Sequence, residues 1–103
     1  EEFKDMKLSE RSLQIFSMYS GKVQKVKIRF SNHLANVVID RFGRDIVMVP
    51  EDDRHFTIRT DIEVSPQFFG WLCGLGRGVR IVSPDEVVEE MRTYVQKIAE
   101  MYQ

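Results

Sequence analysis

Basic side chains recur at every second position of one short segment of the chain. Lys25, Lys27 and Arg29 alternate there with apolar residues, which is the two-residue period of a half-buried β-strand. Arg59 and Arg80 fall at the matching positions of two later strand-like segments. If the apolar side chains of these strands point toward a core, the cations share the opposite face, where clustered positive charge attracts phosphates and other anions. We therefore expect an anion-binding face that uses Arg29, Lys27, Arg59 and Arg80.

An ordinary solvated surface is the alternative interpretation of this face. Asp61 and Glu63 fall on the same side of their strand as Arg59, so the face carries both signs of charge. The chain has 103 residues and a formal net charge of −1, which gives no overall attraction to nucleic acid or to a membrane. Any binding of a polyanion therefore depends on local clustering of lysine and arginine.

The glycines Gly74, Gly76 and Gly78 resemble a phosphate-binding loop only in the type and spacing of the residues. Such loops follow a strand and open a helix, so that backbone N–H groups of the helix point at the anion. Here the order is reversed, because the glycines follow a helix-like segment and precede a strand-like one. We interpret them as a helix exit in which the backbone turns with positive φ.

The sequence does not indicate a metal centre or an enzyme. His33 and His55 lie near turns, and Asp52 and Asp53 are close to the second, but the ligand spacing that zinc sites repeat is missing. Cys73 falls within an apolar helix-like segment, where a small buried side chain is the default and no general base is indicated. The carboxylates are scattered and form no acid and base pair. We expect no cofactor, no metal and no catalytic activity.

The single cysteine cannot form an internal disulfide, which favours a reducing cytoplasm over secretion. No apolar stretch approaches the roughly 20 residues that a membrane span requires, and residues 1–7 do not resemble a signal peptide. The length fits one domain. Because no methionine begins the chain, we expect a soluble cytoplasmic domain from a longer protein.

The first part of the chain contains a connector, a strand and a helix. Residues 1–21 carry a mixed apolar pattern that could form a short helix, and we interpret them as a connector from an upstream domain, which leaves 22–103 as the folded unit. The alternating strand follows at 24–30. Apolar residues at helical spacing then run from 34 to 42, after a cap at Ser31 or Asn32.

A hairpin and a second helix and strand come next. A short apolar run at 46–49 and an alternating run at 56–64 flank a polar turn and predict two antiparallel strands. Ser65 and Pro66 are typical of a helix start, and 79–82 is a short strand.

The last helix begins with a second start signal. Ser83, Pro84 and Glu86 predict a capping box, in which the serine and the glutamate satisfy free N–H groups of the first turn. The helix is amphipathic. Its apolar stripe consists of Val87, Val88, Met91, Val95, Ile98 and Tyr102.

These elements predict an α+β fold, a ferredoxin-like βαββαβ sandwich with an additional C-terminal helix. Right-handed crossovers place the first and third strands side by side, so the expected sheet order is four, one, three, two. The helices would cover one face, with Trp71 packed on the sheet. The face that carries the cations would stay open.

Several segments together resemble the C-terminal extension, or WCX domain, of WYL-domain transcriptional regulators. They are Val26 to Phe30, Val38 to Gly43, Ser65 to Leu72, Leu75-Gly76 and Ile81 to Pro84. In that family an Arg-Phe pair in the first strand, a Trp-Leu-x-x-Leu-Gly helix exit and a proline before the last helix recur in this order. The resemblance covers about Lys22 to Tyr102.

The resemblance implies a bacterial regulator that binds DNA through an N-terminal winged helix-turn-helix and senses through a central WYL domain, neither of which is in this sequence. Residues 1–21 would connect to the absent WYL domain. The extension would contribute to dimerisation and to the response to an effector. The motif that names the WYL domain is absent, so its effector residues cannot be transferred.

Two functions remain open at this point. The first is a regulatory module that forms a homodimer and whose basic face helps to hold an anionic effector, such as a nucleic-acid fragment. Its structural or interface residues would be Trp71, Phe69, Ile98, Met101 and Tyr102. The second is a stand-alone small-molecule binding domain, with a pocket between the helix of Trp71 and the last helix.

Overall fold

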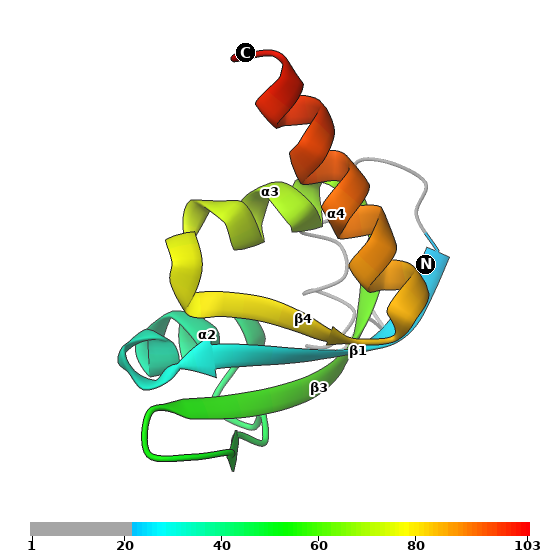
Figure 1. Ribbon diagram of the computed structural model, residues 1–103. Coiled ribbons are helices and arrows are strands. Elements are labelled where there is room, and N and C mark those ends of the chain that lie inside the picture. Colours follow the sequence, from blue (N-terminus) through cyan, green and yellow to red (C-terminus); the bar gives the residue numbers. More distant parts are fainter. Residues whose placement is uncertain (1–21) are drawn as a thin grey trace.

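The computed structural model describes residues 22–103, which form a four-stranded antiparallel sheet and three α-helices (Figure 1). The strands are β1 (Lys22–Ser31), β2 (Val49–Pro50), β3 (His55–Val64) and β4 (Val79–Ser83). The helices are α2 (Ala35–Phe42), α3 (Pro66–Gly74) and α4 (Asp85–Glu100), with the short 3₁₀ helices η2 (Asn32–Leu34) and η3 (Gly76–Gly78). The α+β class and the sheet order, β2-β3-β1-β4, agree with the sequence-based expectation. The connector and the short helix expected within 1–21 lie outside the described residues.

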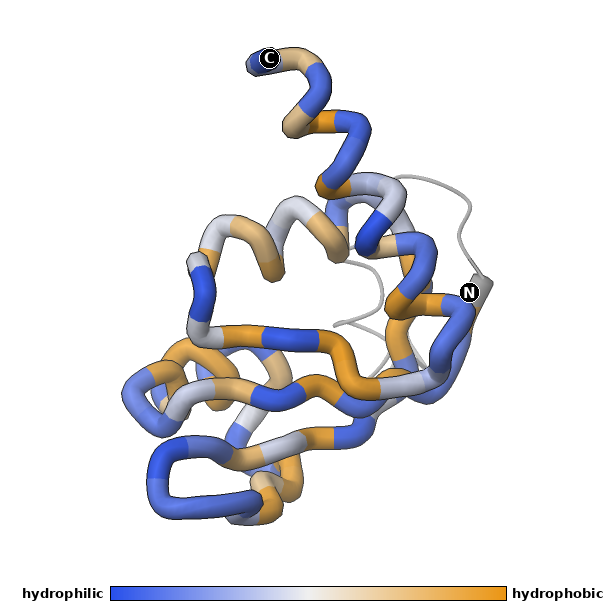
Figure 2. Tube along the Cα trace, in the orientation of Figure 1, coloured by the Kyte–Doolittle hydropathy of each residue, from blue (hydrophilic) through white to orange (hydrophobic). Residues whose placement is uncertain are grey.

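The alternating segment forms a central strand, because β1 pairs with β3 on one side and with β4 on the other. Val26, Ile28 and Phe30 are 0% exposed. Ile28 lies opposite Ile58, and the ring of Phe30 stacks on Phe56 with centroids 5.6 Å apart. Burial of such a side chain contributes about 1.5–3 kcal/mol. Figure 2 shows the resulting alternation of polar and apolar residues along the strands.

Each α-helix contributes fully buried side chains to the same core. Val38 comes from α2, Phe68 and Leu72 from α3, and Val87 from α4. They form one cluster with Val26, Ile28 and Phe30 of β1. Lys25, Lys27 and Arg29 alternate with these residues and therefore lie on the other face of the sheet.

The predicted start of α3 is confirmed. Ser65 is the N-cap, its Oγ accepts a hydrogen bond from the N–H of Phe68 at 3.3 Å, and Pro66 occupies the first turn. The helix exit also follows the prediction, because Gly76 has a φ of +81°. Most residues avoid this region of φ, whereas glycine enters it without a steric cost.

The capping box predicted for α4 is wrong. Ser83 still belongs to β4, and the N-cap is Pro84, whose carbonyl accepts from the N–H groups of Val87 and Val88 at 3.0 and 3.1 Å. The Ser83–Pro84 peptide bond is cis. Because the strand extends one residue further than expected, the serine pairs within the sheet, opposite Lys27. Acidic residues in the first turn of α4 instead interact favourably with the helix dipole.

Two further boundaries differ from the prediction. Neither Ser31 nor Asn32 caps α2 through its side chain, because the 3₁₀ helix η2 precedes α2 and Leu34 is its N-cap. The second strand is Val49–Pro50 rather than 46–49. Its proline is tolerated because β2 is an edge strand, where one side of the backbone has no partner strand.

Cys73 and Trp71 lie differently from the expectation. Cys73 is exposed rather than buried in the core, because α3 turns Phe68, Phe69 and Leu72 toward the sheet. Partial burial nevertheless raises the pKa of the Cys73 thiol above its ordinary value. Trp71 is half-buried at the margin of the core, where its ring meets Phe42 of α2 edge to face, with centroids 5.7 Å apart.

The C-terminal turns of α4 project away from the rest of the domain (Figure 1). Only the first part of the helix approaches the sheet, where Val87 is buried. None of the helices in residues 22–103 has the length and apolar character that a membrane-spanning segment needs.

Candidate anion-binding face

The sheet brings the predicted cations together on one face. We call Lys25, Lys27 and Arg29 of β1, Arg59 of β3 and Arg80 of β4 the basic face. In antiparallel pairs, residues directly opposite each other point to the same side of the sheet. The register places Lys27 opposite Arg59 and Arg29 opposite Arg80, so the shared face expected from the alternation is confirmed.

Two of these cross-strand pairs have like charge. Lys27 faces Arg59 across β1 and β3, and Arg29 faces Arg80 across β1 and β4. Like charges directly opposite each other destabilise a sheet. Within residues 22–103, Lys27, Arg59 and Arg80 form no ion pair with a carboxylate. The sheet therefore holds three cations that the described part of the chain leaves uncompensated.

The other two cations have carboxylate partners. Lys25 Nζ lies 3.3 Å from Asp61 Oδ1, which follows from their opposed positions on β1 and β3. Arg29 Nε lies 3.3 Å from Glu51 Oε1. Both pairs are solvent-exposed, and such pairs typically contribute about 0–1 kcal/mol. An incoming anion can therefore compete for Arg29 and Lys25.

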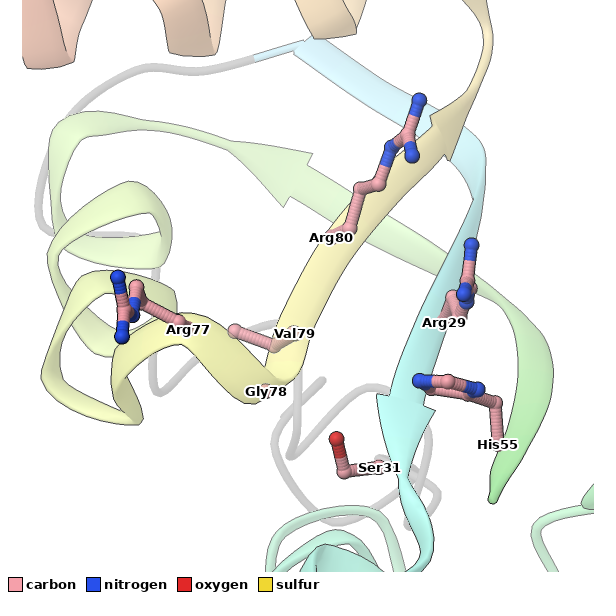
Figure 3. A pocket seen from close by; sticks show the side chains of 7 residues that line it. All are labelled: Arg29, Ser31, His55, Arg77, Gly78, Val79 and Arg80. Atoms are coloured by element: carbon pink, nitrogen blue, oxygen red, sulfur yellow. The ribbon is translucent and has the colours of Figure 1, made fainter. Parts of the chain in front are cut away.

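A hollow of about 200 Å³ adjoins the basic face (Figure 3). It is lined by Arg29, Ser31, His55, Arg77, Gly78, Val79 and Arg80. In Figure 3, Arg29 and Arg80 extend from neighbouring strands, His55 comes from β3 beside them, and Arg77 projects from η3 at the other end. The guanidinium, imidazole and hydroxyl groups give the hollow hydrogen-bond donors that suit an anion.

Gly78 determines how closely η3 approaches the end of β1. A Cβ atom at this position would lie 3.1 Å from Ser31 Oγ and 3.2 Å from Leu34 Cδ1. A side chain would therefore push η3 away from β1. The contact fixes Arg77 and Arg80, which flank the glycine, next to the β1 cations.

The turn between β2 and β3 supplies the acidic margin of the site. Asp52 Oδ1 accepts a hydrogen bond from the N–H of Arg54 at 2.8 Å and lies 2.9 Å from His55 Nδ1. The bond from Arg54, followed by the interactions with His55, lowers the pKa of Asp52 below its ordinary value. Asn32 ties this turn to the end of β1, since its N–H donates to the Arg54 carbonyl at 2.8 Å and its Nδ2 donates to the Asp53 carbonyl at 3.0 Å.

Sequence reasoning found four of the five cations as binding candidates but missed Ser31, His55 and Arg77. These residues lie at the ends of elements, and only the strand register and the close approach of η3 bring them together. The pairing of Ser31 with His55 follows from counting both strands from Ile28 and Ile58. The sequence alone did not predict this pairing, because the pairing can be counted only when the register of β1 and β3 is known.

A pocket was expected between the Trp71 helix and the last helix, and two aromatic side chains meet directly across part of this boundary. The rings of Phe69 on α3 and Tyr94 on α4 lie 5.5 Å apart. A cavity of about 300 Å³ does adjoin Trp71, but its other lining residues, Val37, Asp40 and Arg41, belong to α2. The Arg41 guanidinium covers the Trp71 ring at 5.0 Å from its centroid.

Comparison with known families identifies the fold unit. The family model for the WCX domain matches residues 22–99, from the first residue of β1 into the last turn of α4. The chain belongs to the WCX domain family. The resemblance to the C-terminal extension of WYL regulators is thereby confirmed. None of the curated proteins compared with the chain matches it.

The matched region contains the whole candidate site. All five cations of the basic face and the lining of the hollow fall within 22–99. The site is therefore part of the WCX domain, a WYL-associated regulatory domain.

Proposed function

We propose that this WCX domain is the C-terminal regulatory and dimerisation module of a bacterial, cytoplasmic WYL-family transcriptional regulator. The regulator would bind DNA through an N-terminal helix-turn-helix domain. The module performs no catalysis. Its basic face holds part of an anionic effector, such as a fragment of single-stranded nucleic acid.

The like-charge pairs across β1 are the observation that carries the effector part of the proposal. Lys27 and Arg59, and Arg29 and Arg80, repel each other in the free domain. An anion that lies between them relieves this repulsion and gains the attraction of several cations at once. A sheet selected only for stability would not repeat such a pair on adjacent strands.

An extended polyanion fits the shape of the face. Alternate residues of a strand recur about every 6.8 Å, and neighbouring strands lie about 4.8 Å apart. The cations are therefore spread over an area of the sheet and do not converge on one point. A single small anion occupies only part of this area. The backbone of a nucleic acid presents one charge after another and can satisfy them all.

Dimerisation is supported by the apolar end of α4. Ile98, Met101 and Tyr102 project from the domain with 40%, 78% and 85% of their surface exposed. Contiguous exposed apolar surface of this kind marks interaction sites. Covering it with another protein surface removes it from water.

The effector proposal is tested by titrating a labelled single-stranded oligonucleotide of about ten nucleotides against the wild type, Arg29→Ala and Arg80→Ala. Arg44→Ala is the matched control, because Arg44 is exposed in the loop between α2 and β2. Each face variant should weaken binding of every base sequence to a similar extent, and Arg80→Ala should also lower the salt slope by about 0.7. Equal binding by all four proteins, or no binding at low salt, would leave the face as ordinary surface.

A further inference from the structure

A groove of about 600 Å³ runs between β4 and α4. Its lining is Val79, Arg80, Ile81, Val88, Met91, Arg92, Val95 and Gln96. Among residues 22–103, β4 is an edge strand of the sheet and pairs only with β1. One wall of the groove is therefore a strand edge whose backbone groups pair with no other described strand, and the other wall is an apolar helix face.

The apolar side chains of α4 are buried to different degrees. Val87 is buried in the core and Val88, Met91 and Tyr94 are partly buried against it, whereas Val95 and Ile98 are 43% and 40% exposed. One apolar series on α4 is spaced three, four, three and four residues apart, which is the spacing of a helix-packing seam. We call this series the α4 seam: Val88, Met91, Val95, Ile98 and Tyr102.

The seam is longer than the groove that it lines. Val88, Met91 and Val95 border the groove, whereas Ile98 and Tyr102 lie beyond it on the turns that project from the domain (Figure 1). Each chain thus offers an apolar groove and, on the same helix, an apolar end without a groove. In a dimer with a two-fold axis both apolar surfaces are covered, because the apolar end of each helix can lie in the groove of the other copy.

The charges of α4 favour an antiparallel arrangement. The first eight residues of the helix carry four acidic side chains and one arginine, whereas the stretch after residue 96 carries one lysine and one glutamate. Parallel helices would place the two acidic halves together. Antiparallel helices place each acidic half beside the nearly neutral end of the other copy, and the groove adds the cations of Arg80 and Arg92.

We propose that α4 of a second copy packs antiparallel against the α4 seam, with Ile98 over Val95 and Tyr102 over Met91 of the opposite chain. This assignment rests on the dimerisation part of the proposed function and names its surface and partner. The two-fold axis passes between Val95 and Ile98. Arg80 borders both the groove and the basic face, whereas the other four cations of the basic face do not line the groove.

Disulfide trapping tests the register in the 103-residue chain. Cys73→Ser removes the native thiol, and Val95→Cys and Ile98→Cys are then prepared as separate proteins in that background. Mixed and oxidised, they should form a disulfide-linked heterodimer, because facing seam residues bring Cα atoms within about 7 Å. The matched control replaces Val95→Cys by Thr93→Cys, which lies on the opposite side of α4 and should give no more cross-link than random collision.

Sedimentation of Val95→Asp and Thr93→Asp separates this inference from the proposed function. Val95 is 43% exposed, so the aspartate should leave the fold intact, which circular dichroism checks. Val95→Asp should weaken self-association at least about tenfold, and Thr93→Asp should leave it unchanged. A dimer that survives Val95→Asp and gives no trapped heterodimer would overturn this interface while dimerisation through another surface stands. A monomeric wild type would overturn both, and the oligonucleotide titration would still decide the effector proposal.

Discussion

At the scale of single residues, the candidate site depends on a position with no side chain. Gly78 lets η3 lie against Ser31 and Leu34, and two of the three arginines of the hollow, Arg77 and Arg80, lie close to it in the sequence. Asn32 acts similarly at the other margin by holding the acidic turn to the end of β1. The cations are thus placed by residues that carry no charge.

We expect Gly78→Ala to destabilise the domain by about 1–3 kcal/mol, because the added methyl group overpacks a contact that is already close. Gly74→Ala is the matched control, since a Cβ there meets nothing within 4 Å, and it should be neutral or stabilising by up to about 1 kcal/mol. Urea unfolding followed by tryptophan fluorescence measures both. A similar result for the two variants would contradict the close packing of η3.

Residue types alone predicted the cations but not the hollow beside them. Lys27, Arg59 and Arg80 could be assigned to one face because a strand has a fixed period of two. His55 and Arg77 could not, since their approach depends on register and on a glycine contact between elements. Cys73 was misplaced because an apolar neighbourhood in sequence does not say which side of a short helix faces the core.

At the scale of elements, β1 determines both the core and the site. Val26, Ile28 and Phe30 are buried in the core, and the residues that alternate with them provide three of the five cations. The order of elements was predictable from caps, glycines and apolar periods. The start of α4 was not, because the pairing of Ser83 with β1 outweighs its tendency to cap a helix.

We predict that Arg59→Glu raises the free energy of unfolding and weakens oligonucleotide binding at the same time. The change converts the like-charge pair with Lys27 into an opposite-charge pair, which is worth roughly 0.2–1 kcal/mol. Arg44→Glu makes the same change of charge in an exposed loop and should alter stability less. Denaturant unfolding and the oligonucleotide titration give the two readouts. Loss of stability in Arg59→Glu would show that the pair is not repulsive.

At the scale of the whole molecule, the basic face works against an overall charge that is slightly negative. Salt screens the attraction between the basic face and an anion, so that it reaches only about 8–10 Å at physiological salt. Binding must come from the cations that touch the anion. The number of these cations then sets the dependence on salt.

We predict a salt slope of about −2 for single-stranded oligonucleotide. Each neutralised charge contributes about −0.7, and three cations of the face have no carboxylate partner within residues 22–103. Glu51→Gln releases Arg29 and should steepen the slope by about 0.7 and tighten binding. Glu90→Gln removes the same charge from the exposed side of α4 and serves as the control. The slope is obtained from binding constants at four or more salt concentrations. Identical slopes for the two variants would exclude competition between Glu51 and the anion.

The ion pair between Arg29 and Glu51 also makes binding at the face depend on how many linked charges an anion carries. Glu51 is tethered, so Arg29 experiences it at an effective concentration in the millimolar range or above, which a dilute monovalent anion does not match. A chain of phosphates already held by Lys27, Arg59 and Arg80 presents its next phosphate to Arg29 at a comparable local concentration. We therefore expect a ligand with several linked charges to displace Glu51 from Arg29 more readily than the same concentration of single small anions does.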